Sequence, residues 1–209
     1  SAVGVYFALP AVGMPGVALQ AGLLVFIFFH VLNHLFFKAG LFMSVGAIIS
    51  ATHTRDLDEM GGLARAWPAF SGIALLLCLA AAALPPFGTF FGEWAYVQTL
   101  SVSFLQLPPV FSIAAGFILS IIALVAGLAL FASVKMFSVI FLGRPRTAHA
   151  EKVTPMSWLR MLPPAFCAAA LAASGFVVMP LLNTSLFSAP ATSIFADTVI
   201  TGAGINAWF

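Results

Sequence analysis

Long apolar runs, separated by short polar or proline-rich breaks, dominate the hydrophobic pattern of this chain. The longest run without proline covers residues 17–51. As one helix it would extend about 52 Å, at about 1.5 Å per residue, whereas the hydrocarbon core of a bilayer is about 30 Å thick. The pattern therefore predicts a membrane helix that tilts, bends near Gly40, or projects past the membrane.

Four further apolar segments follow, at about residues 67–84, 87–107, 110–142 and 157–182. Pro85 and Pro86 separate the first two of these segments. Because proline breaks helices, residues 87–107 are either a new helix or the second half of a broken one. We predict a membrane domain of about four to five transmembrane helices across residues 17–182. Residues 1–16 are typical of the end of a truncated helix followed by a turn, and the mixed composition of residues 183–209 predicts no element.

Composition supports the membrane assignment. Of the 209 residues 62% are hydrophobic and 7% are charged, against about 25% charged in an ordinary soluble domain. Continuous apolar runs of this length indicate helices, which satisfy their own backbone hydrogen bonds in hydrocarbon. We predict an all-α, polytopic transmembrane helix bundle with a broken helix. Because the chain lacks an initial methionine and starts and stops in apolar sequence, we expect a fragment of a larger fold.

The charged residues and the cysteines exclude several classes of function. The net charge of +2 is too small to indicate a nucleic-acid partner or an acidic substrate. Cys78 and Cys167 stand alone in apolar runs, without a CxxC pair or a histidine at ligand spacing. We therefore expect no metal, no cofactor and no catalytic redox centre in this chain, and we assign any redox chemistry to partner subunits.

Two polar loops, residues 52–66 and 143–157, carry much of the charge. If each of four spans crosses the membrane once, we expect the two loops to face opposite sides. Loop 143–157 holds three basic residues against one acidic residue, so the positive-inside bias places it in the cytoplasm. Trp67, just after the first loop, stands where an interfacial aromatic residue would, and we expect it to be a membrane-belt or packing residue rather than a chemical group.

Three basic groups lie inside the most apolar part of the chain. His30, His34 and Lys38 are four residues apart, so each step turns by about 40° and rises about 6 Å along a helix. They form a ladder on one helical stripe. A charge at the bilayer centre costs at least about 2.5–3.5 kcal/mol, so the stripe needs water or polar partners. The pattern indicates a proton relay; the alternative is neutral buried histidines with a lysine that extends to the interface.

Glu93 and Lys135 are the other ionisable candidates. Glu93 follows the Pro85-Pro86 break, and a break at membrane depth frees backbone groups that need water or polar side chains. Its alternative is an interfacial carboxylate near a helix start, where the helix dipole favours it. Lys135 lies seven residues before Leu142, close enough to a helix end that its side chain could simply reach the interface.

Several motifs in this order resemble a known family. HVLNHLFFKAGLFMSVGAII, TRDLDEMGGL, ALPPFGTFFGEW and VKMFSVIFLGRPR resemble the antiporter-like proton-pumping subunits shared by complex I, Mrp antiporters and membrane-bound hydrogenases. The likeness covers roughly residues 17–165. It is strongest to the branch of hydrogenase-4 component B and formate hydrogenlyase subunit 3.

The resemblance implies the C-terminal portion of a fold with two inverted repeats, each containing a broken helix. It implies that His30, His34 and Lys38 belong to a central proton relay and that Glu93 occupies the terminal proton-exchange position. Lys135 matches a basic position of the hydrogenase-type members. The glutamate and lysine pair that the family carries on earlier helices has no counterpart here, so the chain would hold half of a translocation unit.

The leading hypothesis is a proton-translocating membrane subunit of a hydrogenase-4-like or complex I-like (NADH-quinone oxidoreductase type) complex in a bacterial or archaeal cell membrane. The resemblance implies other membrane subunits and a peripheral redox arm as partners, with nickel-iron and iron-sulfur centres only in those partners. Alternatives are an Mrp-type cation/proton antiporter subunit and a non-conducting membrane anchor.

Overall fold

A computed structural model of the chain describes residues 17–106, 109–147, 151, 153 and 156–182. The expectations for residues 1–16 and 183–209 lie outside these ranges. Every regular element among the described residues is helical, which confirms the all-α prediction. The main helices are α2 (Val17–Thr52), α4 (Pro68–Ala81), α5 (Gly88–Gln106), α6 (Pro109–Phe141) and α8 (Trp158–Leu182).

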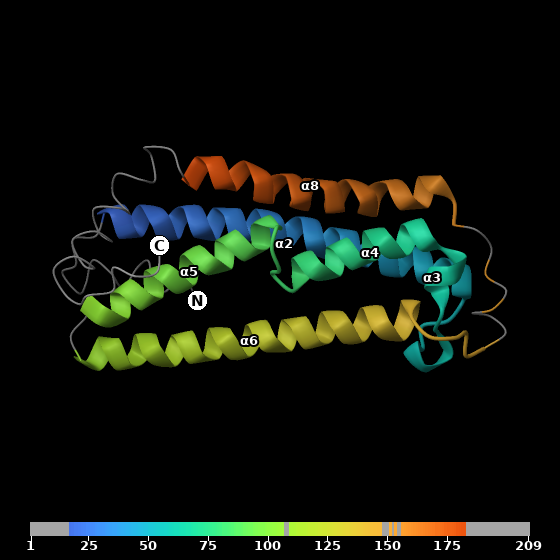
Figure 1. Cartoon of the computed structure of the whole chain (residues 1–209), viewed down its shortest axis with the longest axis horizontal. Coiled ribbons are helices and arrows are strands. Elements are labelled where there is room, and N and C mark those ends of the chain that lie inside the picture. Colours follow the sequence, from blue (N-terminus) through green and yellow to red (C-terminus); the bar gives the residue numbers. More distant parts are fainter. Residues whose placement is uncertain (1–16, 107–108, 148–150, 152, 154–155, 183–209) are drawn as a thin grey trace.

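The helices run roughly along one long axis (Figure 1), and α2 contacts α4, α5 and α8. Within the described part of the chain, three stretches are long and apolar enough to cross a membrane: Phe26–Thr52, Ser112–Phe141 and Trp158–Val177. Helix α2 continues through Gly40 without interruption. Gly40 instead allows close packing, because an added Cβ there would lie 2.6 Å from Leu77 Cδ2 and 3.0 Å from Cys167 Cβ.

Helices α4 and α5 behave as two halves of one broken span. Helix α4 has 14 residues, about 21 Å at about 1.5 Å per residue, and is too short to cross a bilayer alone. After the break at residues 82–87, α5 continues in the same direction along the bundle (Figure 1). The pair therefore crosses the bundle once.

This single crossing overturns the expectation that the two polar loops face opposite sides. Both loops lie at the same end of the bundle and are hydrogen-bonded to each other. Gly62 N donates to Leu142 O at 2.9 Å, and Arg146 donates to Leu57 O at 3.1 Å. The expectation was wrong because only two crossings, the α4–α5 pair and α6, separate the two loops, and two crossings return the chain to the side from which it started.

The glycine pair in TRDLDEMGGL is explained by this docking. Gly61 and Gly62 have φ angles of 141° and 70°, which disfavour other residues. Added Cβ atoms would lie 2.7 Å from Arg144 O and 2.8 Å from Pro145 Cδ, respectively. The MGGL and GRPR motifs are thus two sides of one contact.

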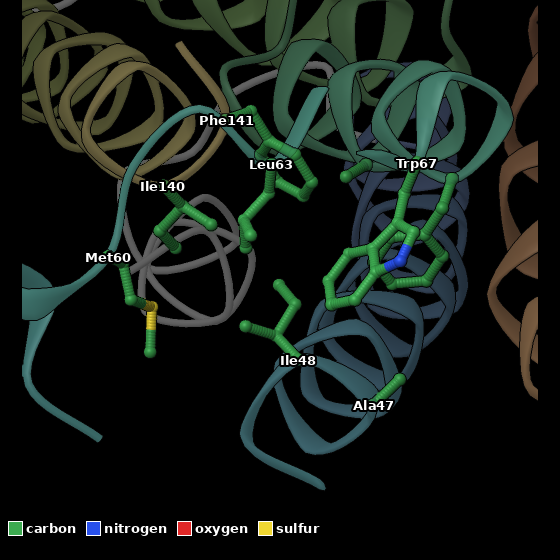
Figure 2. Close-up of a cluster of buried hydrophobic side chains, with 9 residues drawn as sticks. Ala47, Ile48, Met60, Leu63, Trp67, Ile140 and Phe141 are labelled. Atoms are coloured by element: carbon green, nitrogen blue, oxygen red, sulfur yellow. The ribbon is translucent and has the colours of Figure 1, made fainter. Parts of the chain in front are cut away.

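Beneath the joined loops lies a buried apolar cluster that ties α2, α3 (Leu63–Ala66), α4 and the end of α6 together. Figure 2 shows Ile48, Leu63 and Ile140 converging from three of these elements. Trp67 packs in this cluster edge-on to Phe70 and is 2% exposed. It is a packing residue of the loop end rather than an exposed interfacial aromatic.

Candidate functional site

The three ladder residues lie on α2 with unequal exposure. The rings of His30 and His34 are 6.1 Å apart between centroids, so consecutive rungs are neighbours. His30 is half-buried, and its Nδ1 is buried without a hydrogen-bond partner among the described residues. His34 and Lys38 are exposed. The ladder therefore runs from the interior of the bundle to its surface.

An aromatic contact joins the inner end of the ladder to the broken helix. Phe26 lies 5.4 Å from the His30 ring and stacks on Tyr96 of α5, with 4.7 Å between centroids and 6° between planes. At the other end of the histidine pair, Phe37 meets His34 edge-on at 4.7 Å. Phe26 is thus shared between His30 and the helix that carries Glu93.

Glu93 is half-buried in the second turn of α5. Its neighbour Gly92 faces α2, since a Cβ there would stand 3.7 Å from Phe26 and Phe29. Tyr96, three residues further on, also packs on Phe26. Glu93 therefore lies between two residues that touch the His30 segment of α2.

Lys135 is exposed on α6, a helix that packs against α4 and α5. Its backbone carbonyl accepts from the Ser138 hydroxyl at 3.2 Å. No hydrogen bond or ion pair joins the Lys135 ammonium to another described residue, and the structure does not link it to the ladder.

The helix break carries its own polar contacts. The Pro85-Pro86 bond is cis, and residues 82–87 separate α4 from α5. Across this gap the buried Thr89 hydroxyl donates to Ala80 O at 2.6 Å. Gly175 of α8 touches the break so closely that a Cβ there would overlap Pro86 O and lie 3.1 Å from Gly88 N.

Two polar residues at this break, Asn33 and Ser174, were not among the candidates predicted from the sequence. Asn33 is 1% exposed, and its Oδ1 accepts from the Ser174 hydroxyl of α8 at 2.7 Å. Its Nδ2 donates to Phe29 O one turn earlier, at 2.8 Å. The available signal was an amide between the two histidines of HVLNH, because a buried amide in an apolar helix requires partners.

Comparisons with known proteins agree on one family. Residues 12–123 match the family described as NADH:quinone oxidoreductase/Mrp antiporter, TM. The chain is 38% identical to hydrogenase-4 component B of Escherichia coli (strain K12) over 156 residues, which are 72% of this chain and 23% of that protein. It is 35% identical to formate hydrogenlyase subunit 3 of the same strain over 151 residues, covering 68% of this chain and 24% of that protein.

A third relative is the Na(+)/H(+) antiporter subunit A1 of Staphylococcus aureus (strain Newman), 32% identical over 175 residues, or 82% of this chain and 21% of that protein. The chain thus spans about a quarter or less of the length of these relatives. The family match extends over more than half of the chain and includes the ladder, the break and Glu93. This chain belongs to the NADH:quinone oxidoreductase/Mrp antiporter transmembrane family, as a segment of an antiporter-like membrane subunit.

Proposed function

We propose that the chain is part of a proton-translocating membrane subunit of a hydrogenase-4-like or complex I-like oxidoreductase complex. Protons would move along His30, His34 and Lys38 and exchange with Glu93, driven by redox chemistry in partner subunits. The observation that carries the proposal is the Phe26 contact, which holds the α5 segment bearing Glu93 against the inner end of the ladder.

The chemistry of these groups suits transfer in steps. A neutral imidazole both donates and accepts a proton, so adjacent histidine rings 6.1 Å apart need only a small bridging group such as water between them. A protonated Lys38 would repel a proton on His34 and drive it toward His30 and Glu93. Glu93, beside the helix break, would receive that proton as a carboxylate.

The assembly and its orientation belong to the same proposal. The relatives named above as components or subunits support further membrane subunits and a peripheral redox arm as partners. Arg55, Arg65, Arg144 and Arg146 all gather at the loop end of the bundle. By the positive-inside bias this end, loop 143–157 included, faces the cytoplasm of a bacterial or archaeal cell.

A second candidate is a cation/proton antiporter subunit. The Na(+)/H(+) antiporter subunit A1 relative supports it, because the likeness extends over 82% of this chain. Lys38 and Glu93 would then exchange protons in response to cation binding elsewhere in the protein. This candidate predicts a dependence on Na⁺ or K⁺ that a redox-driven pump lacks.

The test uses the full-length protein in its native complex, in inverted membrane vesicles. Substrate-driven redox turnover and proton uptake are measured together for wild type, Lys38→Ala and Glu93→Gln, after pull-down confirms assembly. Glu151→Gln, an exposed loop carboxylate, is the matched control for Glu93→Gln. We expect a tenfold or larger loss of uptake in Lys38→Ala and in Glu93→Gln and none in the control, because each step of the relay needs its group.

Each result separates the candidates. Normal uptake in both Lys38→Ala and Glu93→Gln would leave the segment as a non-conducting membrane anchor and refute the relay. The antiporter candidate predicts a different pattern. Wild type would then move protons when Na⁺ or K⁺ is supplied without a redox substrate, and Lys38→Ala and Glu93→Gln would lose that cation-driven movement.

A further inference from the structure

A partly buried polar junction between three elements lies at the helix break. Asn33 of α2 accepts the hydroxyl hydrogen of Ser174, which belongs to α8, at 2.7 Å. Gly88, the first residue of α5, lies against this pair: an added Cβ would stand 2.7 Å from Asn33 Oδ1 and would overlap Ser174 Oγ. The hydrogen bond thus forms where the second half of the broken helix begins.

The junction is confined by backbone as well as by side chains. Gly175, next to Ser174, presses α8 onto the carbonyl of Pro86. On the α2 side, Asn33 is fixed by its second hydrogen bond to Phe29 O. The Ser174 hydroxyl has one hydrogen to donate and two acceptors within reach, Asn33 Oδ1 at 2.7 Å and Leu171 O at 2.8 Å. The bond between the helices is therefore one of two arrangements open to this hydroxyl.

The junction also lies next to the groups that the proposed function uses. Asn33 stands between His30 and His34 in the chain, and Gly88 precedes Glu93 by five residues, about 7 Å along a helix. Beyond Gly88, Gly92 keeps α5 in contact with the same helix. Fixing Gly88 therefore fixes how far Glu93 lies from His30.

We propose that Asn33 and Ser174 are positioning residues, whose hydrogen bond holds the start of α5 in register with the histidine ladder and so sets the proton-transfer distance between Glu93 and His30. This inference rests on the proposed function. It differs from a purely structural role because loss of the bond uncouples proton movement from redox turnover while leaving the helices assembled.

The experiment uses the full-length protein in its complex, in inverted vesicles, and measures protons taken up per redox turnover. The variants are Ser174→Ala, Asn33→Leu and the two combined. Ser44→Ala is the matched control, because Ser44 is also buried in the bundle and donates only to a backbone carbonyl of its own helix, Gly40 O at 2.8 Å.

We expect Ser174→Ala to keep its redox turnover and to lower its protons per turnover, because losing one interhelical hydrogen bond in a membrane shifts the ratio of in-register to displaced α5 by about three- to fivefold. The double variant should be no worse than Asn33→Leu, since both changes remove the same bond. Ser44→Ala should retain the wild-type ratio. A Ser174→Ala ratio equal to that of Ser44→Ala, or fully additive losses, would overturn the proposal.

Glu93→Gln, measured in the same experiment, distinguishes failure of the proposed function from failure of the positioning role. Normal pumping in Glu93→Gln would refute the proposed function and the positioning role together. Loss of pumping in Glu93→Gln combined with a normal ratio in Ser174→Ala would refute the positioning role alone.

Discussion

Replacing Gly175 by alanine tests the contact between α8 and the helix break. The new Cβ would overlap Pro86 O and lie 2.9 Å from the Pro86 carbonyl carbon, closer than real Cβ atoms approach. Because these are backbone atoms, no side-chain rotation relieves the overlap, and α8 must move away from the break. Overpacking of this kind costs about 1–3 kcal/mol, and the rigid neighbours place this site at the upper end. The helix-propensity gain of about 1 kcal/mol offsets part of that cost and leaves about 2 kcal/mol of net destabilisation.

Gly92→Ala is the matched control, since it also replaces a buried helical glycine by alanine, here where α5 packs against α2. Its Cβ would meet Phe26 and Phe29 at 3.7 Å, an ordinary van der Waals separation. Thermal unfolding of the purified full-length protein in detergent, followed by tryptophan fluorescence, compares the two variants. We expect Gly175→Ala to melt several degrees below wild type and Gly92→Ala to melt at or above it. Equal melting temperatures for the two variants would refute the close approach of α8 to the break.

Three further predictions follow from the described contacts. Thr89→Val should lower the stability of the protein by about 1 kcal/mol in the same melting assay, because it replaces the hydroxyl group that donates to Ala80 O. Gly40→Ala should also lower the melting temperature, because the new methyl group would stand 2.6 Å from Leu77 Cδ2 and 3.0 Å from Cys167 Cβ. Leu77→Ala destabilises the protein by itself, because Leu77 is fully buried, and the double variant should lose less than the sum of the two single losses. Arg146→Met should free the loop around residue 57, so that trypsin cleaves the 52–66 loop faster; with a cytoplasmic loop end, this cleavage occurs in inverted vesicles and not in right-side-out ones.

The helices and the ladder could be predicted because they depend on local pattern. Continuous apolar runs predict membrane helices regardless of what surrounds them, and spacing by four residues places His30, His34 and Lys38 on one stripe of any helix. The proline pair likewise predicts a break from chain geometry alone. These features need no knowledge of distant neighbours.

The remaining features depend on contacts between distant segments. Asn33 and Ser174 are 141 residues apart, and the local sequence around either residue does not indicate that the other is its hydrogen-bond partner. The placement of both polar loops at one end depended on whether α4 and α5 cross once or twice, and apolar pattern alone is the same in either case. For Trp67 the sequence left a membrane-belt role and a packing role open, and only the contacts with residues of α2, α4 and α6 decide for packing.

The exposed part of the ladder identifies one face of α2 that is too polar to face lipid. His34 and Lys38 lie on the surface of α2, within a stretch long and apolar enough to span a membrane. An exposed ammonium facing hydrocarbon at that depth would cost about 2.5–3.5 kcal/mol or more, and no ion pair with a described residue offsets it. Since the chain spans 21–24% of the length of its relatives, we infer that this stripe packs against polar groups of the protein's other segments. The inner rung at His30 meets α5 within the described bundle, whereas the outer rungs at His34 and Lys38 are exposed on its surface.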